Sequence, residues 1–379
     1  MKIALVVPGG VDRSGEYRVV PAVLALLRRL SRRHEVHVFA LRQEAEPAQW
    51  MLEGACIHNI GGHRLTTTAR AVLAVLREHR RCGGFDLVQS LWSGSSGLVA
   101  VLAARLLGLP SAVHYTGGEL LALREIGYGG RLNWRGRLRE ALVLRGATRV
   151  TASSWPIVEL IAALGRTAQR LPLGVDLDAW PQCKPAARDL REPVRLIHVA
   201  SLNAVKDQAT LLRAMALLAA AGIRFHLDVV GEDTLGGSVQ TLARHLKLMP
   251  HRICFHGFMT QGQLRPLFER AHINVVSSLH EAGPFVLLEA AASGLPSVGT
   301  AVGHLKEWAP DATLAVAPRD PVALAASIRI LIDDEALRLR TAEAAQRRAE
   351  AEDADHTAAL FDRLYAEMTA VPGVAICGR

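Results

Sequence analysis

The stretch VRLIHVAS, residues 194–201, is an almost continuous apolar run near the middle of a chain of 379 residues. A similar run, KIALVVP at residues 2–8, opens an alternation of apolar runs and amphipathic stretches that fills the first half of the chain. VRLIHVAS starts the same alternation again. Apolar strands separated by helices are typical of parallel sheets covered on both faces. The sequence therefore predicts an α/β fold with two doubly wound parallel-sheet domains.

The other apolar runs set the extent of each domain. They lie at residues 34–41, 85–91, 110–117, 148–154, 168–174, 225–231, 252–258, 273–279, 296–300 and 313–317. Segment 181–193 contains three prolines and mixed charge, which indicates an interdomain linker. We therefore expect an N-terminal domain at 1–180 and a C-terminal domain at 181–353. The amphipathic stretch 354–370 precedes no strand, so we expect it to pack back across the junction and assign 354–379 to the N-terminal domain.

The composition indicates a soluble globular protein, because half of the residues are apolar and 21% are charged. The first apolar run is too short for a signal peptide, and charged residues follow it at once. The longest apolar region, 98–113, is interrupted by an arginine, a glycine and a proline, which makes it a poor membrane span. The five cysteines are scattered without a CxxC pair, which argues against a disulfide framework or a structural zinc site.

Positive charge is concentrated in the first half of the chain. Residues 1–176 contain 23 lysines and arginines against 13 acidic residues, and the arginines cluster at 28–33 and 129–140. These clusters form either a solvated face or a surface that attracts anionic lipid headgroups or an anionic acceptor. No nucleic-acid-binding motif accompanies them, so we expect no nucleic-acid partner. We expect a cytoplasmic location. If the basic clusters bind anionic lipid headgroups, the protein would lie at the inner face of the plasma membrane.

The stretch HEAGPFVLLEAAASG, residues 280–294, contains two glutamates, Glu281 and Glu289. Gly283 and Pro284 predict the N-cap and first residue of a helix, whose free N–H groups would favour an anion. Glu289 stands in an otherwise apolar or small run, and a buried carboxylate needs hydrogen-bond donors. It either makes a contact inside the fold or accepts hydrogen bonds from two ligand hydroxyls, such as a ribose diol.

Several segments together carry a resemblance to a known family. They are GVD (174–176), VASLNAVKDQATLLRA (199–214), LDVVGEDTLGGSVQTLARHL (227–246), HGFMTQGQL (256–264) and HEAGPFVLLEAAASGLPSVGT (280–300). The last of them resembles the glutamate–seven–glutamate motif of retaining glycosyltransferase family 4, the group that includes glycogen and sucrose synthases, and the first resembles that family's interdomain crossing. The similarity covers nearly the whole chain. It implies the GT-B fold, in which two Rossmann-like domains face a cleft, the N-terminal one for the acceptor and the C-terminal one for the nucleotide-sugar donor.

The resemblance also implies roles for particular residues. Lys206 would neutralise the donor diphosphate, Glu289 would hold the ribose hydroxyls, and Glu281 would contact the transferred sugar. Backbone groups would contact the base and the distal phosphate or sugar at Gly257, Phe258, Gly283, Pro284 and Phe285.

The sequence departs from the family pattern at three places. Ser201 stands where the family usually has an arginine, which leaves one cation for the diphosphate. The family's Gly-Gly loop is represented by residues 14–16, where we favour Gly15 for close approach to phosphate. Where relatives carry a histidine after a strand, this chain has Thr116, with His114 before it and Glu119 after it. Glu119 is the better candidate for the sugar or acceptor, and His114 is either a strand residue or a catalytic one.

The implied reaction is metal-independent hexosyl transfer, with retention of anomeric configuration, from a UDP- or GDP-sugar to a hydroxyl of a glycan or lipid-linked acceptor. Such an enzyme would serve polysaccharide biosynthesis and would need no cofactor. Two Asp-x-Asp strings, at 176–178 and 353–355, follow no nucleotide-binding strand and are interpreted as helix caps or solvated charges, so we expect no catalytic metal. The glycines near the N-terminus lack GxGxxG spacing, which argues against a dinucleotide dehydrogenase. The alternatives are a non-catalytic nucleotide-sugar-binding subunit and a sugar-nucleotide 2-epimerase.

Overall fold

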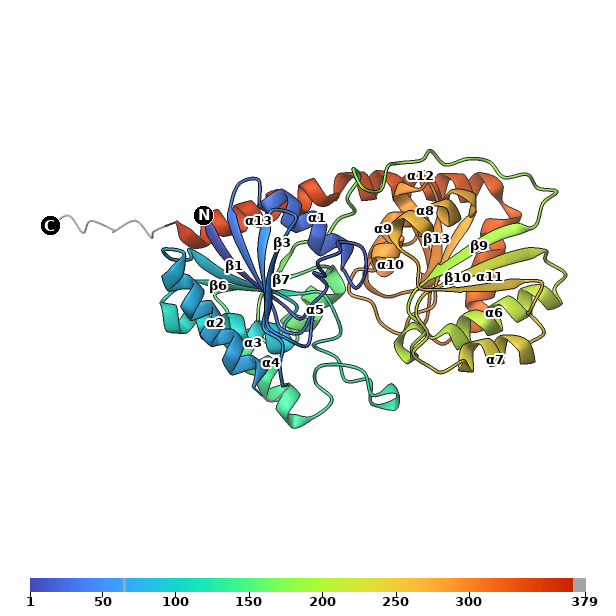
Figure 1. The fold of residues 1–379 in the computed structure, drawn as a ribbon. Coiled ribbons are helices and arrows are strands. Elements are labelled where there is room, and N and C mark those ends of the chain that lie inside the picture. The colour runs from blue at the N-terminus through green and yellow to red at the C-terminus, as the bar shows by residue number, and fades with distance from the viewer. Residues whose placement is uncertain (64–65, 371–379) are drawn as a thin grey trace.

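The computed structural model describes residues 1–63 and 66–370 and contains two α/β units, each built on one sheet (Figure 1). The expected doubly wound fold is confirmed. Residues 371–379 of the predicted return segment lie outside the described residues.

The N-terminal sheet has the strand order β3-β4-β2-β1-β5-β6-β7-β8, and every pair is parallel except β3 with β4. Its strands are β1 (Lys2–Val7), β2 (Glu35–Ala40), β3 (Ala48–Leu52), β4 (Ala55–Asn59), β5 (Leu87–Leu91), β6 (Ser111–Tyr115), β7 (Arg149–Ala152) and β8 (Gln169–Arg170).

The C-terminal sheet is fully parallel and has the order β11-β10-β9-β12-β13-β14. Its strands are β9 (Val194–Val199), β10 (Phe225–Val230), β11 (Ile253–Gly257), β12 (Ile273–Val276), β13 (Ser297–Thr300) and β14 (Thr313–Val316). Strands are added outward from β9 on one side and from β12 on the other, so the order reverses between these two. In open parallel sheets, ligands bind at the carboxyl ends of the strands at such a switch point.

Helices cover both faces of each sheet. In chain order they are α1 (Pro21–Leu30), α2 (Thr67–Arg81), α3 (Gly94–Leu107), η1 (Arg124–Ile126), α4 (Trp134–Gly146), α5 (Trp155–Ala162), η2 (Ala204–Lys206), α6 (Gln208–Ala220), α7 (Ser238–His245), α8 (Gln261–Arg270), α9 (Phe285–Ala292), α10 (Gly303–Trp308), α11 (Pro321–Asp333), α12 (Glu335–Ala351) and α13 (Ala354–Thr369). No helix among the described residues combines the length and apolar character needed to cross a bilayer.

The chain passes between the units at Gly174. Leu173 belongs to the apolar core of the N-terminal sheet, whereas Val175 and Trp180 pack in the core of the other unit. A side chain on Gly174 would come within 2.1 Å of the Glu352 carbonyl oxygen, so the outgoing and returning chains touch here. The crossing therefore lies within GVD (174–176), the segment that resembles the family's interdomain crossing, and earlier than the boundary after residue 180 that the prolines predict.

The C-terminal helix returns to the N-terminal unit, as expected. Figure 1 shows α13 lying beside α1, and Phe361, Leu364 and Tyr365 are buried in the same core as that helix. Thr357, near the start of α13, accepts a hydrogen bond from the Gly174 N–H at 2.8 Å and donates one to the Pro172 carbonyl at 2.9 Å. The Thr357 hydroxyl thus links the start of the returning helix α13 to the outgoing chain at residues 172–174.

Replacing Thr357 by alanine is expected to lower the free energy of unfolding by about 1–3 kcal/mol, because it leaves buried backbone groups without partners. Thr357→Ser keeps the hydroxyl and serves as the matched control. Urea unfolding followed by tryptophan fluorescence measures both variants. Equal midpoints for Thr357→Ala and the unchanged protein would show that the hydroxyl does not hold the crossing.

Candidate active site

A cleft of about 860 Å³ lies between the two units. Loops that follow β1 and β6 line it from one side, and loops that follow β9, β11 and β12 line it from the other. The cleft thus includes the switch point of the C-terminal sheet. Of the residues predicted from the sequence, those that line it are Gly15, Ser201, Lys206, Phe258, Glu281, Gly283, Pro284, Phe285 and Glu289.

The segment after β12 enters α9 one residue later than predicted. Pro284 is the N-cap, with extended backbone angles, and Phe285 is the first helical residue, whereas the sequence placed the N-cap at Gly283. Gly283 is packed against His304, whose ring would lie 2.8 Å from an added side-chain carbon. Only a glycine therefore allows α10 to approach this closely while the start of α9 opens into the cleft.

Glu289 projects from α9 to the wall of the cleft and is only 8% exposed. Its carboxylate accepts one long hydrogen bond, at 3.3 Å, from the side-chain amide of Gln261. Burial raises the pKa of Glu289 from 4.5 to about 7. With a single neutral donor in the described part of the chain, this buried carboxylate has acceptor capacity to spare, which two ligand hydroxyls could use.

Lys206 ends the short helix η2 and faces the cleft. Asn203 caps this turn by accepting a hydrogen bond from the Lys206 N–H, and Ser277 donates to the Lys206 carbonyl at 2.8 Å. The backbone N–H of Leu279 donates to the carbonyl of Val205 at 2.7 Å. These bonds fix the loop after β9 to the end of β12.

The ammonium of Lys206 lies 2.5 Å from a carboxylate oxygen of Glu281, which also accepts a hydrogen bond from the Ser278 hydroxyl at 2.6 Å. The side chains of both ionised residues are largely covered, at 24% and 12% exposed. The pair therefore holds a cation and an anion side by side on the wall of the cleft, shortly before the start of α9.

Cations are scarce in this cleft. Among the described lining residues, Lys206 and Arg28 are the lysines and arginines. Arg28 is already engaged by Glu53 and Asp176 at 2.7–2.8 Å, so Lys206 is the cation placed to meet a ligand anion at the C-terminal wall. Ser201 lines the wall after β9, and its carbonyl accepts a hydrogen bond from Gln208.

The loop after β1 reaches across to the C-terminal unit. Gly15 has a φ of +70°, in the left-handed region that favours glycine, and it lines the cleft. Tyr17 in the same loop lies with its ring centroid 6.0 Å from that of Phe258. Gly257, at the end of β11, also has a positive φ, and its carbonyl accepts a hydrogen bond from the Gly231 N–H, but it does not line the cleft itself.

Two predicted catalytic residues do not reach the cleft. His114 is fully buried within β6, where it bonds Thr151 at 2.9 Å and its ring lies 5.7 Å from that of Phe361 on the return helix. Burial lowers the pKa of His114 to about 3, so it is a neutral core residue. Glu119 turns back into the N-terminal unit, where its carboxylate accepts a hydrogen bond from the Ser93 N–H at 3.1 Å. We therefore remove both from the candidate site.

The structure adds residues that the sequence did not single out. Gln261 donates a hydrogen bond to Glu289, and Ser278 donates one to Glu281. Asn203 caps the short helix η2, which ends at Lys206. His280 donates a hydrogen bond to the Gly117 carbonyl at 3.3 Å and so joins the two walls of the cleft. All but Gln261 lie in the loops after β9 and β12, and Gln261 begins α8 just after β11. A search of every polar residue after a predicted strand would have found them.

Both Asp-x-Asp strings have structural roles. The string at 353–355 provides a helix cap, as expected, whereas the string at 176–178 takes part in ion pairs. Asp353 caps α13 by accepting a hydrogen bond from the His356 N–H. Asp176 is neither a cap nor a solvated charge, because Arg28 and Arg29 bond it at 2.8 and 3.0 Å. Arg28 and Arg29 of the predicted basic cluster at 28–33 are therefore used inside the fold, whereas Arg32 and Arg33 are exposed.

Two units with a cleft at the sheet switch point define the GT-B class of folds. Residues 185–348 match the family described as Glycosyl transferases group 1, and residues 19–174 match the Glycosyl transferase 4-like domain. A D-inositol 3-phosphate glycosyltransferase of Frankia alni is 30% identical over 70% of this chain and 70% of that protein. The chain belongs to the glycosyltransferase family.

Other relatives match over shorter lengths. The putative glycosyltransferase EpsF of Bacillus subtilis is 30% identical, and the match covers 64% of this chain and 63% of that protein. A glycogen synthase of Mycobacterium tuberculosis is 34% identical over 46% of this chain and 42% of its own length. The chain thus spans less than two thirds of either protein.

Solved structures share the fold over nearly the whole chain. A sucrose-phosphate synthase from Thermosynechococcus elongatus superposes with a TM-score of 0.81 at 18% identity, covering 98% of this chain and all of that one. Anabaena HepE in complex with UDP-glucose gives a TM-score of 0.75 at 18% identity, covering 97% of this chain and all of that one. These identities establish the shared fold.

Proposed function

We propose that this protein transfers a hexosyl group from a nucleoside-diphosphate sugar to an acceptor hydroxyl, with retention of configuration at the anomeric carbon. The observation that carries the proposal is the arrangement around α9. Glu289, with unused acceptor capacity, stands within that helix, and the Lys206–Glu281 pair stands before it. A ribose diol, a diphosphate and a sugar carry the complementary groups.

The proposed chemistry relies on stabilising the leaving group. The bond from the anomeric carbon to the diphosphate oxygen breaks, and its electron pair stays with that oxygen. The Lys206 ammonium and the free N–H groups at the start of α9 stabilise the charge that develops. The acceptor hydroxyl attacks the same face of the sugar, and its proton goes to the departing phosphate. Glu281 orients the sugar, and no protein nucleophile and no metal ion take part.

The donor is proposed to be a UDP- or GDP-sugar. Support for uridine is that HepE, which shares the fold, has been solved with UDP and with UDP-glucose. The acceptor is proposed to be a glycan or a lipid-linked saccharide in polysaccharide biosynthesis. The name of the relative EpsF describes it as a putative glycosyltransferase and gives no acceptor. The proposed acceptor class therefore rests on the chemistry of the cleft and on the surface of the N-terminal unit.

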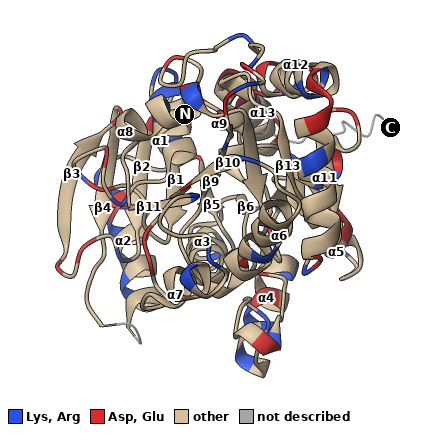
Figure 2. Cartoon of the chain, turned by 90° about the vertical axis from the view of Figure 1, so that its right-hand side faces the viewer, with Lys and Arg blue, Asp and Glu red and all other residues tan. Residues whose placement is uncertain are grey.

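A peripheral membrane contact is proposed for α4. Trp134, Leu138 and Leu142 are each more than half exposed and recur at helical spacing along one face. Arginines flank them, and Figure 2 shows α4 extending below the rest of the chain with several basic residues. An apolar stripe edged by arginines suits the headgroup region of an anionic bilayer.

Sedimentation with vesicles of anionic phosphatidylglycerol tests the membrane contact. The unchanged protein should sediment with the vesicles, and the variant Leu138→Ser/Leu142→Ser should stay largely in solution. The linker residue Leu190 is similarly exposed, so Leu190→Ser serves as the control and should still sediment. Equal sedimentation of the two variants would assign binding to general charge rather than to α4.

The raised pKa of Glu289 predicts a pH dependence of donor binding. The carboxylate form accepts the ribose hydroxyls, and in the free protein that form predominates only above about pH 7. Donor affinity should therefore rise by up to about tenfold per pH unit as the pH approaches 7 from below and level off above it. Calorimetry with UDP-glucose, whose phosphates do not titrate there, measures the effect. Glu289→Gln should remove the pH dependence.

A donor screen separates transfer from its alternatives. UDP, GDP, ADP and CDP are first compared by thermal shift, and the sugar nucleotide of the stabilising base is then incubated with and without saccharide acceptors. Release of nucleotide and a new α- or β-linked product, matched to the donor configuration by NMR, supports retaining transfer. A nucleotide that binds and never turns over would favour the binding-only alternative that Ser201 suggests, and sugar isomerisation without an acceptor would favour the epimerase.

A further inference from the structure

A cluster of side chains that can bind a metal lies outside the cleft, on two neighbouring strands near one edge of the N-terminal sheet. Strand register brings it together: His37 on β2 is paired with Cys56 on β4, and His58 lies two residues further along β4. Alternate residues of a strand share a face, so all three point to the side that α2 covers. Their ligand atoms lie within 4.8 Å of one another, and none of the three lines the cleft.

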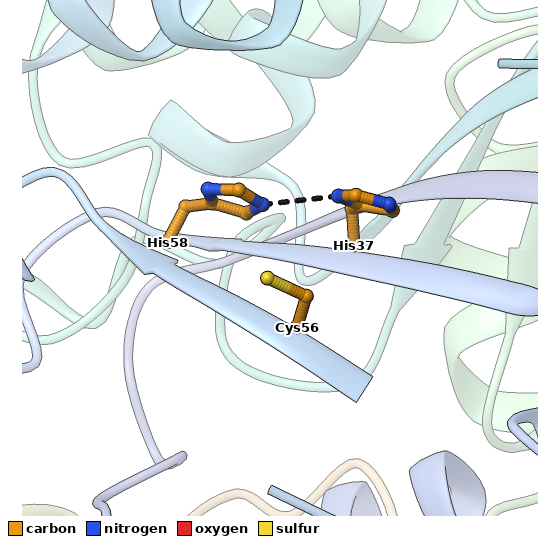
Figure 3. Close-up of side chains that lie close together, drawn as sticks. All are labelled: His37, Cys56 and His58. Atoms are coloured by element: carbon orange, nitrogen blue, oxygen red, sulfur yellow. Dashed lines mark hydrogen bonds between the residues drawn. The ribbon is translucent and has the colours of Figure 1, made fainter. Parts of the chain in front are cut away.

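The geometry is close to that of a bound ion. Nδ1 of His37 lies 3.0 Å from Nε2 of His58, and Figure 3 shows the two rings facing each other with Cys56 beside them. Two imidazole nitrogens at tetrahedral angles on one Zn²⁺ are about 3.3 Å apart, given zinc–nitrogen bonds of about 2.0–2.1 Å. Small rotations of the rings would therefore suffice to admit the ion.

Surrounding groups prepare this cluster for a cation. Nε2 of His37 lies 3.1 Å from a carboxylate oxygen of Glu35, and donation to that oxygen leaves Nδ1 as the acceptor of the neutral ring, with its lone pair directed at Nε2 of His58. Metal-binding histidines are commonly oriented by such a carboxylate. Glu78 of α2 lies 3.6 Å from the same Nδ1 and offers a carboxylate as a fourth ligand. Phe39 stacks on His58 at 4.8 Å and fixes its ring.

We propose that His37, Cys56 and His58 form a zinc-type structural metal site, with Glu78 in the fourth position. Two nitrogens, one thiolate and one carboxylate match the ligands that Zn²⁺ takes in tetrahedral sites, and the two negative ligands balance its charge. The ion would tie β4, the strand next to the sheet edge, to β2 and to α2. It takes no part in catalysis. Cysteine spacing gave no sign of this site, because its ligands come together through strand pairing instead of a CxxC turn.

A similar group elsewhere provides a matched control. Asp228, Cys254 and His256 also lie within ligand distance of one another. There, the Arg270 guanidinium stands 3.4 Å from the Asp228 carboxylate and supplies the positive charge that an ion would bring. We therefore expect that group to bind no metal, and Cys254→Ser should behave like the unchanged protein.

The test uses the full chain, stripped with a chelator and titrated with Co²⁺ as a spectroscopic substitute for Zn²⁺. The expected result is one equivalent of tetrahedral Co²⁺ with a thiolate-to-metal charge-transfer band, present in Cys254→Ser and absent in Cys56→Ser. Zn²⁺ should raise the unfolding temperature of the unchanged protein and of Cys254→Ser, and it should leave that of Cys56→Ser unchanged. Glu35→Gln should weaken Zn²⁺ binding by about 10–100-fold, as for other groups that orient a ligand.

Two results would overturn the site. One is a Co²⁺ spectrum without a thiolate band in the unchanged protein, and the other is a band that survives in Cys56→Ser, which would assign the thiolate to another cysteine. Circular dichroism checks that Cys56→Ser is folded. His58→Gln gives a second variant, which should also lose the tetrahedral spectrum.

Discussion

Glu289→Gln is expected to weaken nucleotide-sugar binding by about 100-fold, because hydrogen bonds to a buried charged group contribute about 1.5–3 kcal/mol each. The substitution keeps the volume of the side chain and removes its charge. It also removes the unfavourable burial of a carboxylate whose one hydrogen-bond partner among residues 1–63 and 66–370 is Gln261. The variant should therefore unfold at the same or a higher temperature than the unchanged protein while binding its ligand more weakly. Calorimetry and thermal unfolding measure the two effects separately.

A deoxyribose ligand makes the assignment specific. If Glu289 holds the ribose hydroxyls, a 2′-deoxy nucleotide should bind the unchanged protein weakly and bind Glu289→Gln about as weakly as the natural nucleotide does. The two changes would then be non-additive in a double-mutant cycle. Fully additive losses would show that Glu289 acts elsewhere, as a buried structural carboxylate. Gln263→Ala, which alters another glutamine of α8 at its exposed start, controls for general disturbance of this wall.

The strands of both sheets could be predicted because central parallel strands are buried on both faces and read as apolar runs. The antiparallel pair β3–β4 was not predicted. AQWML at 48–52 alternates between half-buried and exposed positions at the sheet edge, so it contains no apolar run. The crossing at Gly174 agrees with the resemblance of GVD (174–176) to the family's interdomain crossing, but the prolines placed the domain boundary later, after residue 180. Prolines mark 181–193 as irregular, but the bonds of Arg188 and Arg338 hold this segment against the C-terminal unit.

The position of the candidate site could be predicted because loops after parallel strands converge at one edge. The contacts of each side chain could not. His114 stands near the end of a strand, yet the return helix, more than 200 residues later in the sequence, covers it. Glu119 follows two glycines, and only the fold shows that its loop turns toward Ser93. The Lys206–Glu281 pair likewise depends on the register of β9 with β12, which the sequence does not display.

Lys206→Ala is expected to lower kcat by about 100–1000-fold, the usual loss when one group that stabilises developing negative charge is removed. The expectation is at the upper end of what a single lysine contributes, because Arg28, the other cation along the described part of the cleft, is held by Glu53 and Asp176. KM for the donor should change less than kcat, since the charge on the leaving oxygen is greatest in the transition state. Steady-state kinetics with saturating acceptor measures both.

Two variants separate loss of charge from loss of structure. Lys206→Arg keeps a cation and should recover part of kcat, whereas Glu281→Gln keeps Lys206 and removes its ion-pair partner. If Glu281 only positions the lysine, the double variant Lys206→Ala/Glu281→Gln should be no slower than Lys206→Ala alone. If Glu281 contacts the sugar, the double variant should be slower still. Lys184→Ala, at the surface, is the control. If kcat of Lys206→Ala equals that of this control, Lys206 does not stabilise the leaving group. The N–H groups at the start of α9 would then be assigned that role, because they are the donors that remain beside the candidate leaving group.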